Sequence, residues 1–170
     1  MNNNRTKTGK KRVKGTSAYD EALYFLTPKA RTVRETENHL DECNFSEVEI
    51  MQSVERLTGN GLLNDEKYAA DFVASRLAAK PVSRQKLREQ LEGHFIDGEV
   101  IDSALAAVTD EVELANAKAV AEKFFRQFAG LELSERLRRV GLRLASRGFS
   151  FDDIKTVLAE LTENLNDDEE

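Results

Sequence analysis

Apolar residues recur at helical spacing along most of the chain, and one arrangement of them occurs three times. An apolar residue is followed by Ser or Asp and, five places after the first, by Ile; the copies begin at Phe45, Ile96 and Phe149. The middle residue can cap a helix N-terminus while its two apolar neighbours pack together as a hydrophobic staple. Each copy also has a leucine five residues before the staple. We therefore predict three copies of one helix pair.

A further helix precedes each pair. The apolar pattern places these leading helices over residues 18–26, 65–79 and 112–129. The helices that follow them are each expected to begin near a hydroxyl residue, namely Thr32, Ser83 and Ser134. No segment alternates with a period of two, and helix-forming residues dominate, so we expect no sheet. The predicted fold is all-α, with three tandem three-helix repeats.

The repeats divide the chain into five parts. These are a basic disordered tail (1–17), repeat 1 (18–60), repeat 2 (61–110), repeat 3 (111–161) and an acidic tail (162–170). Units of about 45 to 50 residues are too small to hold a good core alone. We therefore expect the repeats to share apolar surface and to stack into an elongated, curved array.

The stretch between repeats 1 and 2 reads as a joint between two helices. Gly59 and Gly61 can take the left-handed conformation that ends a helix, and Asn64 can cap the next helix. Tyr68 and Phe72, four residues apart, then lie on one face of that helix. The joint is predicted to fix how the second repeat stacks on the first.

Charge is segregated along the 170 residues although the net charge is only -6. Residues 1–17 hold six Lys or Arg and no acid, residues 18–62 hold nine acids against four bases, and residues 118–147 hold eight bases against three acids. A basic region suits nucleic acid or an acidic protein surface, although solvated helix faces explain charge alone equally well. The absence of a long apolar run or a secretory signal predicts a cytoplasmic protein.

No catalytic arrangement is present in the sequence. There is no phosphate-binding glycine loop and no Gly-x-Ser-x-Gly turn. Cys43 is the only cysteine, so an intramolecular disulfide is excluded, and with only His39 and His94 beside it we see no zinc-type ligand spacing. We expect no enzyme activity, no cofactor and no metal.

Basic residues are the better functional candidates. Arg136, Arg139 and Arg143 follow one another at spacings of three and four along one helix stripe. The planar fork of arginine suits phosphate and carboxylate groups, although such a stripe is often only a solvated face. The candidate contact residues are Arg76, Lys80, Arg84, Lys86, Arg88, Arg136, Arg138, Arg139, Arg143 and Arg147, with Lys10, Lys11, Arg12 and Lys14 of the basic tail.

Several separated motifs, in order over about residues 18–161, resemble the RecX family of bacterial recombination regulators. The family's most recognisable run is matched around the joint, and further matches lie at residues 31–35, 84–91 and 147–150. The residues that we take as the structural signature are Gly61, Leu62, Leu63, Asp65, Tyr68, Ala69, Phe72, Gly148 and Phe149. Two turns depart from the family pattern: residues 79–82 lack its glycine-rich basic turn, and Phe95 stands where a glycine is common.

The resemblance implies a monomeric, non-enzymatic protein that binds the RecA recombinase filament on single-stranded DNA. Such a protein inhibits ATP hydrolysis, strand exchange and filament growth, contacts DNA weakly or through the filament, and has no membrane partner. Two alternatives remain open from the residues themselves. One is a stand-alone helical DNA-binding protein, and the other is a helical-repeat adaptor for another protein.

Overall fold

The computed structural model describes residues 17–167, and this part of the chain contains nine helices and no strand. The helices are α1 (Ala18–Leu26), α2 (Val33–Glu42), α3 (Glu47–Gly59), α4 (Asp65–Ala79), α5 (Arg84–Gly93), α6 (Gly98–Leu105), α7 (Asp110–Gln127), α8 (Leu133–Ala145) and α9 (Phe151–Asp167). The all-α prediction is confirmed. Within these residues, no helix has both the length and the apolar character needed to cross a membrane.

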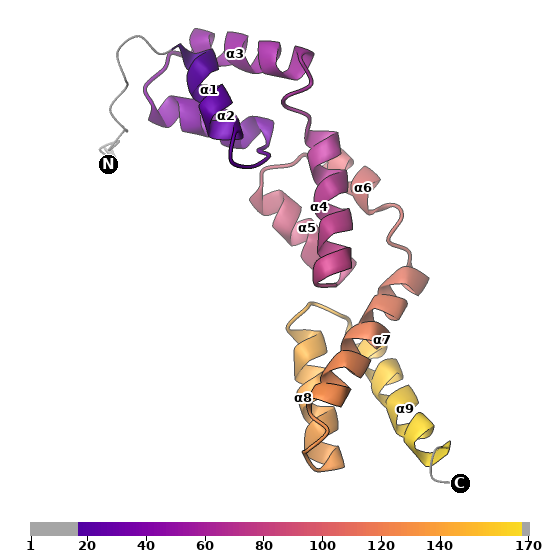
Figure 1. Cartoon of the computed structure of the whole chain (residues 1–170). Helices are drawn as coiled ribbons and strands as arrows, with labels where there is room; N and C mark the ends of the chain where they lie inside the picture. Colours follow the sequence, from indigo (N-terminus) through magenta and orange to yellow (C-terminus); the bar gives the residue numbers. More distant parts are fainter. Residues whose placement is uncertain (1–16, 168–170) are drawn as a thin grey trace, which may run out of the picture.

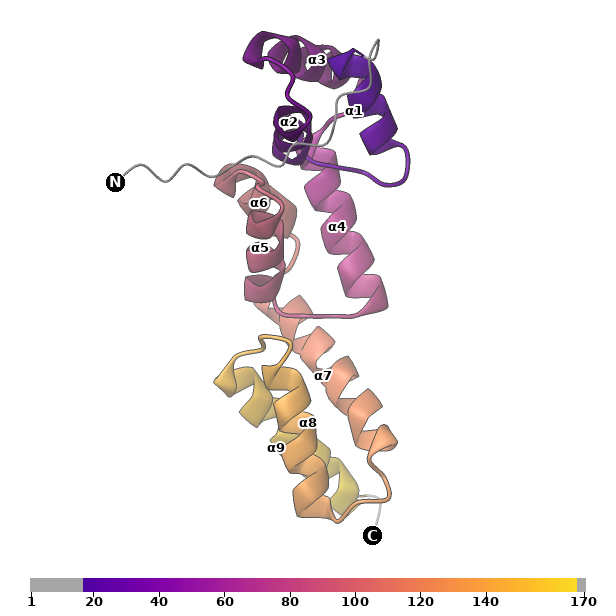
Figure 2. The ribbon, with the colours of Figure 1, turned by 90° about the vertical axis from the view of Figure 1, so that its left-hand side faces the viewer.

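The helices form three groups that follow one another in line (Figure 1). Helices α1–α3 make the first repeat, α4–α6 the second and α7–α9 the third, and the principal helix packing occurs within each repeat. In the view turned by 90°, the first repeat again lies at one end and the third at the other (Figure 2). The described part is therefore an elongated array.

Each repeat has its own hydrophobic core. The three clusters of buried residues are separate, and the leucine that precedes each staple, at 40, 91 and 144, is fully buried in its cluster. The staple residues Phe45, Ile96 and Phe149 are buried beside these leucines. This differs from the expectation that the repeats share apolar surface, because three crossing helices already enclose the stripe of apolar side chains in each repeat.

Most helix caps lie where the sequence places them. Thr32 and Ser46 form reciprocal capping boxes with the glutamates three residues later, and Ser83 and Asn64 accept hydrogen bonds from the first turns of α5 and α4. Helix α8 starts at Leu133, close to the start expected near Ser134, but its cap is not a hydroxyl residue as in the other two repeats. Glu132 caps α8 instead, and its carboxylate accepts both the backbone N–H and the hydroxyl of Ser134.

The C-terminal boundary also differs from the sequence prediction. Helix α9 continues to Asp167, so residues 162–167, assigned above to the acidic tail, extend this helix. At the expected boundary, the hydroxyl of Thr162 donates to the carbonyl oxygen of Leu158 at 2.9 Å. The helical apolar pattern of Leu158 and Leu161 carries the third core to this point.

The turn after the second helix of each repeat is left-handed. Asn44, Phe95 and Gly148 have φ values of 64°, 62° and 85° and occupy equivalent positions, immediately before the staple residue. In each repeat the staple N–H then bonds to the carbonyl of the leucine five residues earlier, at 3.2, 3.2 and 3.4 Å. This six-to-one bond is that of a Schellman motif, and it explains the spacing of five seen in the sequence. Phe95 thus adopts the conformation expected of the absent glycine.

Polar contacts join the first repeat to the second. The hydroxyl of Thr32 at the start of α2 donates to the carbonyl of His94 at 2.8 Å, and the backbone N–H of Val33 donates to Asp65 Oδ1 at 2.9 Å. His94 Nδ1 lies 2.9 Å from Glu35 Oε1. The first turn of α2 is therefore held against the end of α5 and the start of α4.

The second and third repeats are joined in the same way. The N–H of Ser83 at the start of α5 donates to the carbonyl of Arg147, just after α8, at 3.0 Å. The N–H of Arg84 donates to Glu113 Oε1 in the first turn of α7 at 3.1 Å. Because equivalent elements meet at both junctions, the same placement of one repeat on the next is used twice. This repeated placement gives the array its form.

Candidate anion-binding groove

Basic side chains from the second and third repeats line one groove at their junction, with a volume of about 460 Å³. We call this the basic groove; its lining residues are Arg76, Lys80, Val82, Lys86, Gln90, Phe124, Arg143, Ser146 and Arg147. Five of the fourteen basic candidates from the sequence are therefore brought together. They come from α4, α5 and α8 and from the turns after α4 and α8. A groove lined by cations from two repeats can bind an anion that neither repeat would hold alone.

The second repeat supplies three cations. Arg76 lies in the last turn of α4, where its Nε donates to Gln90 Oε1 at 3.0 Å, and Lys80 caps the same helix. The negative end of the α4 dipole favours positive charge at these two positions. Lys86 Nζ forms an exposed ion pair with Glu89 at 2.8 Å. An exposed pair of this kind is weak, so Lys86 can exchange it for another anion.

The third repeat supplies two arginines that share one aromatic neighbour. The guanidinium carbons of Arg143 and Arg147 lie 5.5 and 5.0 Å from the centre of the Phe124 ring. Burial, and then the charge of Arg143, lowers the pKa of Arg147. Arg147 Nε is buried and has no hydrogen-bond partner. Two adjacent like charges with a spare donor favour an anion bound between them.

The arginine stripe of α8 divides into groups with different contacts. Arg136 turns inward: its Nε donates to the carbonyl of Phe125 at 2.7 Å, and its guanidinium covers the Phe125 ring at 3.3 Å. Arg138 and Arg139 both bond to Glu135 at 2.7 Å. These hydrogen bonds lower the pKa of Glu135 to about 2. Glu135 is therefore ionised at neutral pH and offsets part of the positive charge.

A second hollow continues the basic surface along α8. Its volume is about 360 Å³, and it shares Arg143 and Ser146 with the basic groove. Arg138, Arg139 and the exposed Leu142 complete this side of the helix. Arg138, Arg139 and Arg143 thus continue the basic surface from the repeat junction along α8.

Arg84 and Arg88 lie outside the basic groove. Arg84 donates to the Asp110 side chain at 2.6 Å and to the carbonyl of Val108 at 3.1 Å, and it also faces Glu113. Arg88 pairs with Asp102. These contacts connect α5 to α6 and α7, and they pair the charge of both arginines with carboxylates. Four further candidates, Lys10, Lys11, Arg12 and Lys14, lie outside the described residues.

Four of the signature residues lie at the first repeat junction. Asp65 accepts the Val33 N–H, and the rings of Tyr68 and Phe72 each meet His94 edge to face at 5.5 Å. Gly61 has a φ of 69° as expected, whereas Gly59 ends α3 without a left-handed turn. Buried positions such as Leu63, Ala69 and Phe149 belong to the cores, Gly148 lies against Ser83, and Leu62 is half exposed.

Two features of the structure are not predicted from the sequence. The buried Nε of Arg147 gives no signal in the sequence, because it depends on how α8 ends against α5. A group of possible metal ligands, Glu21, His39 and Cys43, was also missed. His39 and Cys43 are four residues apart on one helix face, and that spacing was a usable signal, but Glu21 joins them only when α1 packs on α2.

Fold and groove together define a helical-repeat protein with a basic surface where two of its repeats meet. Two family profiles match the chain: that of the second three-helix domain of RecX over residues 64–105 and that of the third over residues 111–158, together more than half of the residues. The chain belongs to the RecX family.

Curated relatives and solved structures agree with this assignment. Regulatory protein RecX of Bacillus subtilis is 28% identical over 152 residues, which are 89% of this chain and 58% of that protein. Regulatory protein RecX of Limosilactobacillus reuteri is 30% identical over 133 residues, 78% of this chain and 50% of that protein. This chain therefore spans little more than half the length of these relatives. The crystal structure of RecX from Lactobacillus salivarius superposes with a TM-score of 0.72 at 26% identity, covering 85% of this chain and 94% of that one.

Proposed function

We propose that this chain is a regulatory protein that binds the RecA recombinase filament on single-stranded DNA and inhibits its ATPase, strand exchange and extension. It acts as a monomer in the cytoplasm and binds rather than catalyses. The basic groove, with the α8 surface beside it, faces the phosphates of the filament, and the basic tail adds non-specific attraction to DNA.

The convergence of five cations at the junction of repeats 2 and 3 carries this proposal. Arginine and lysine that neutralise phosphates release counterions and so drive binding to nucleic acid. Arg143 and Arg147 are the strongest candidates because they are adjacent, share Phe124 and lack a paired carboxylate among their described contacts. Lys80 and Arg76 extend the same positive surface across the junction.

The first repeat is acidic, in contrast to the basic groove, and it lies at the opposite end of the array from the third repeat (Figure 1). Residues 18–62 hold nine acids against four bases. An acidic repeat is repelled by phosphate but can meet a basic protein surface. A filament presents both protein and phosphate, so an array with one acidic and one basic end matches it better than it matches naked DNA.

Two other functions remain as alternatives. A stand-alone DNA-binding protein would use the basic groove on DNA alone, and its affinity would fall steeply with salt. A helical-repeat adaptor would bind another protein and neither DNA nor recombinase filaments. The acidic first repeat favours the filament over DNA alone, because a protein that only coats DNA gains nothing from nine acids. The basic groove favours the filament over an adaptor that binds no nucleic acid.

Co-sedimentation separates the three functions. The full chain is mixed with RecA filaments on single-stranded DNA, with the same DNA alone and with neither, at low and physiological salt. Filament regulation predicts sedimentation with filaments at both salt concentrations and weak, salt-sensitive sedimentation with DNA alone. Equal sedimentation with DNA and with filaments would identify a DNA-binding protein, and no sedimentation with either would identify an adaptor for another partner.

A further inference from the structure

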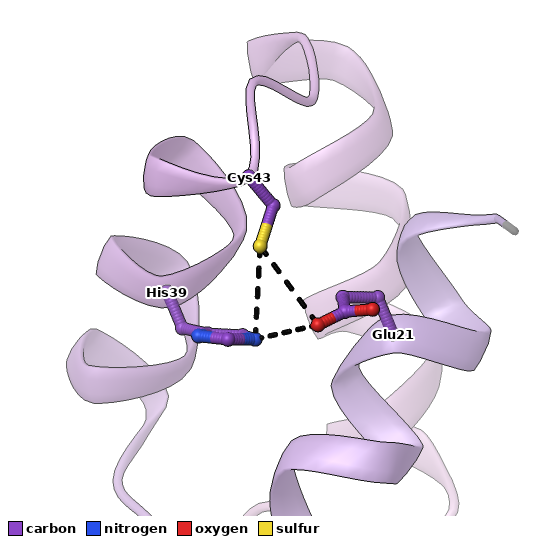
Figure 3. A group of neighbouring side chains, drawn as sticks. All are labelled: Glu21, His39 and Cys43. Atoms are coloured by element: carbon purple, nitrogen blue, oxygen red, sulfur yellow. Dashed lines mark hydrogen bonds and ion pairs between the residues drawn. The ribbon is translucent and has the colours of Figure 1, made fainter. Parts of the chain in front are cut away.

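Three possible metal donors meet in the first repeat, away from the basic groove. His39 Nε2 lies 2.9 Å from Glu21 Oε1, and Cys43 Sγ lies 3.8 Å from each of these atoms (Figure 3). It is the only such group among the described residues that brings together a carboxylate, an imidazole and a thiol. The three atoms form a small triangle.

Two helices hold this triangle in place. Glu21 lies in the first turn of α1, His39 in the last turn of α2, and Cys43 caps α2 one turn later. The ring of Phe25 stacks on His39 with centroids 4.0 Å apart and planes 5° from parallel, which fixes the orientation of the imidazole. The sulfur side is anchored because Cys43 belongs to the hydrophobic core of this repeat. The donors are therefore positioned by packing as well as by their own hydrogen bonds.

We propose that Glu21, His39 and Cys43 bind a divalent transition-metal ion of the zinc class, with water as the fourth ligand. In a tetrahedral zinc site with bonds near 2.0–2.3 Å, neighbouring donors lie about 3.3–3.7 Å apart. The three donor separations of 2.9, 3.8 and 3.8 Å bracket this range. Side-chain movements of a few tenths of an ångström would bring all three atoms to bonding distance.

Exposure and charge fit the same site. Cys43 is 5% exposed, whereas the side chains of His39 and Glu21 are 11% and 23% exposed. Solvent therefore reaches the carboxylate side of the triangle, where a water ligand would lie. One carboxylate and one thiolate balance the two positive charges of the ion, and the mixture of nitrogen, sulfur and oxygen donors favours zinc over magnesium or calcium.

Binding exchanges protons for the metal. The Cys43 thiol, which now donates toward Glu21 Oε1, loses its proton to solvent and becomes a thiolate ligand. Because the Glu21 carboxylate only accepts, His39 Nε2 carries the proton of their hydrogen bond; in the neutral ring this proton transfers to Nδ1 through solvent when the metal binds, which frees the Nε2 lone pair. One proton is then released per ion, so affinity rises with pH. The bound ion would link α1 to α2 more strongly than the Glu21–His39 hydrogen bond does.

Cobalt titration of the full chain under reducing conditions tests the site. We expect a thiolate-to-cobalt charge-transfer band and d–d bands of four-coordinate intensity, which saturate at one equivalent and disappear when zinc is added. His39→Gln, Cys43→Ser and Glu21→Gln should each weaken zinc binding by at least about tenfold, the loss that even outer-shell changes cause. His94→Gln is the matched control, because His94 also pairs with a glutamate at 2.9 Å, and it should bind zinc as the unaltered chain does.

A second measurement uses the unaltered chain and therefore does not depend on how well the variants fold. Zinc should raise the thermal midpoint of the unaltered chain in a concentration-dependent way and should slow alkylation of Cys43 in the folded protein. Absence of the charge-transfer band, or equal zinc affinity in the unaltered chain and in Cys43→Ser and His39→Gln, would overturn the proposal. These results do not depend on the basic groove, which lies in other repeats.

Discussion

The backbone of Gly148 lies directly against the side chain of Ser83, so a Cβ atom at position 148 would come within 2.6 Å of Ser83 Oγ. Gly148 also has a φ of 85°. Both features favour glycine at this position, which lies at the junction of repeats 2 and 3, where the N–H of Ser83 donates to the carbonyl of Arg147. The placement of Arg147 in the basic groove thus depends on a residue without a side chain.

Gly148→Ala should destabilise the protein and weaken anion binding together. The left-handed backbone and the clash with Ser83 each oppose a side chain, so we expect a loss of about 1–3 kcal/mol in the free energy of unfolding, measured with urea. Gly59→Ala is the control, because nothing lies within 4 Å of a Cβ at that position in α3. A Gly148→Ala variant with unchanged stability and unchanged anion binding would contradict the close contact between positions 148 and 83.

Phe95→Gly should have the opposite effect. Phe95 holds the left-handed position of the second repeat with a φ of 62°, yet 56% of its surface is exposed, so its side chain contributes little burial. Removing the strain should stabilise the protein by about 1 kcal/mol in urea unfolding. Asn44→Gly should gain less, because Asn tolerates this conformation. A destabilised Phe95→Gly would show that the aromatic ring has a structural role that its exposure does not reveal.

Asp65→Asn should change how stability depends on pH. Burial raises the pKa of Asp65 above its ordinary value of 3.8. The hydrogen bond from the Val33 N–H lowers this pKa, whereas the charges of three neighbouring glutamates raise it further. The folded state therefore holds the Asp65 proton more tightly than the unfolded state, and this contribution to stability is lost as pH rises from about 4 through the folded pKa. An asparagine keeps an acceptor for Val33 without the charge.

The comparison is made by urea unfolding of both proteins at a series of acidic to neutral pH values. The stability of Asp65→Asn relative to the unaltered chain should increase with pH across that window and then become constant. A relative stability that falls with rising pH would show that the ionised carboxylate is favoured at the junction, contrary to its raised pKa.

Glu135→Gln should strengthen binding to single-stranded DNA. Glu135 is ionised and bonds to Arg138 and Arg139, so it competes with phosphate for both guanidinium groups. Removing its charge should raise affinity about twofold to fivefold at low salt, with a smaller gain at high salt. Fluorescence anisotropy of a labelled oligonucleotide measures this. Glu55→Gln is the control, because it removes one negative charge from the first repeat. An equal gain in DNA affinity in this control would show that the effect depends on net charge alone.

Much of the fold follows from the sequence because it depends on local rules. The staples at Phe45, Ile96 and Phe149, the caps at Thr32 and Ser46, and the helical apolar stripes are set by residues within one or two turns of each other. The leucine five residues before each staple follows from the same local rules. These rules give the helix order and the three-fold repetition, and the structure confirms them.

The site is less accessible to such reasoning because it depends on contacts between repeats. The stripe of Arg136, Arg139 and Arg143 is present as a pattern, but only the structure shows that Arg136 turns onto Phe125 and that Arg143 joins Arg147 over Phe124. The pairing of Arg84 with Asp110 and Glu113 is likewise a contact between helices distant in sequence.

Inhibition of the DNA-dependent ATPase of RecA by charge-reversed variants tests whether the basic groove contacts the filament. Lys80→Glu with Arg143→Glu places two negative charges in the basic groove at exposed positions, and Arg34→Glu with Lys67→Glu makes the same change in net charge at exposed positions of the first two repeats. With thermal unfolding of both variants unchanged, we predict that the groove variant loses inhibition by about tenfold or more while the control keeps it. Full inhibition by the groove variant, or equal loss in both, would contradict the assignment of the basic groove.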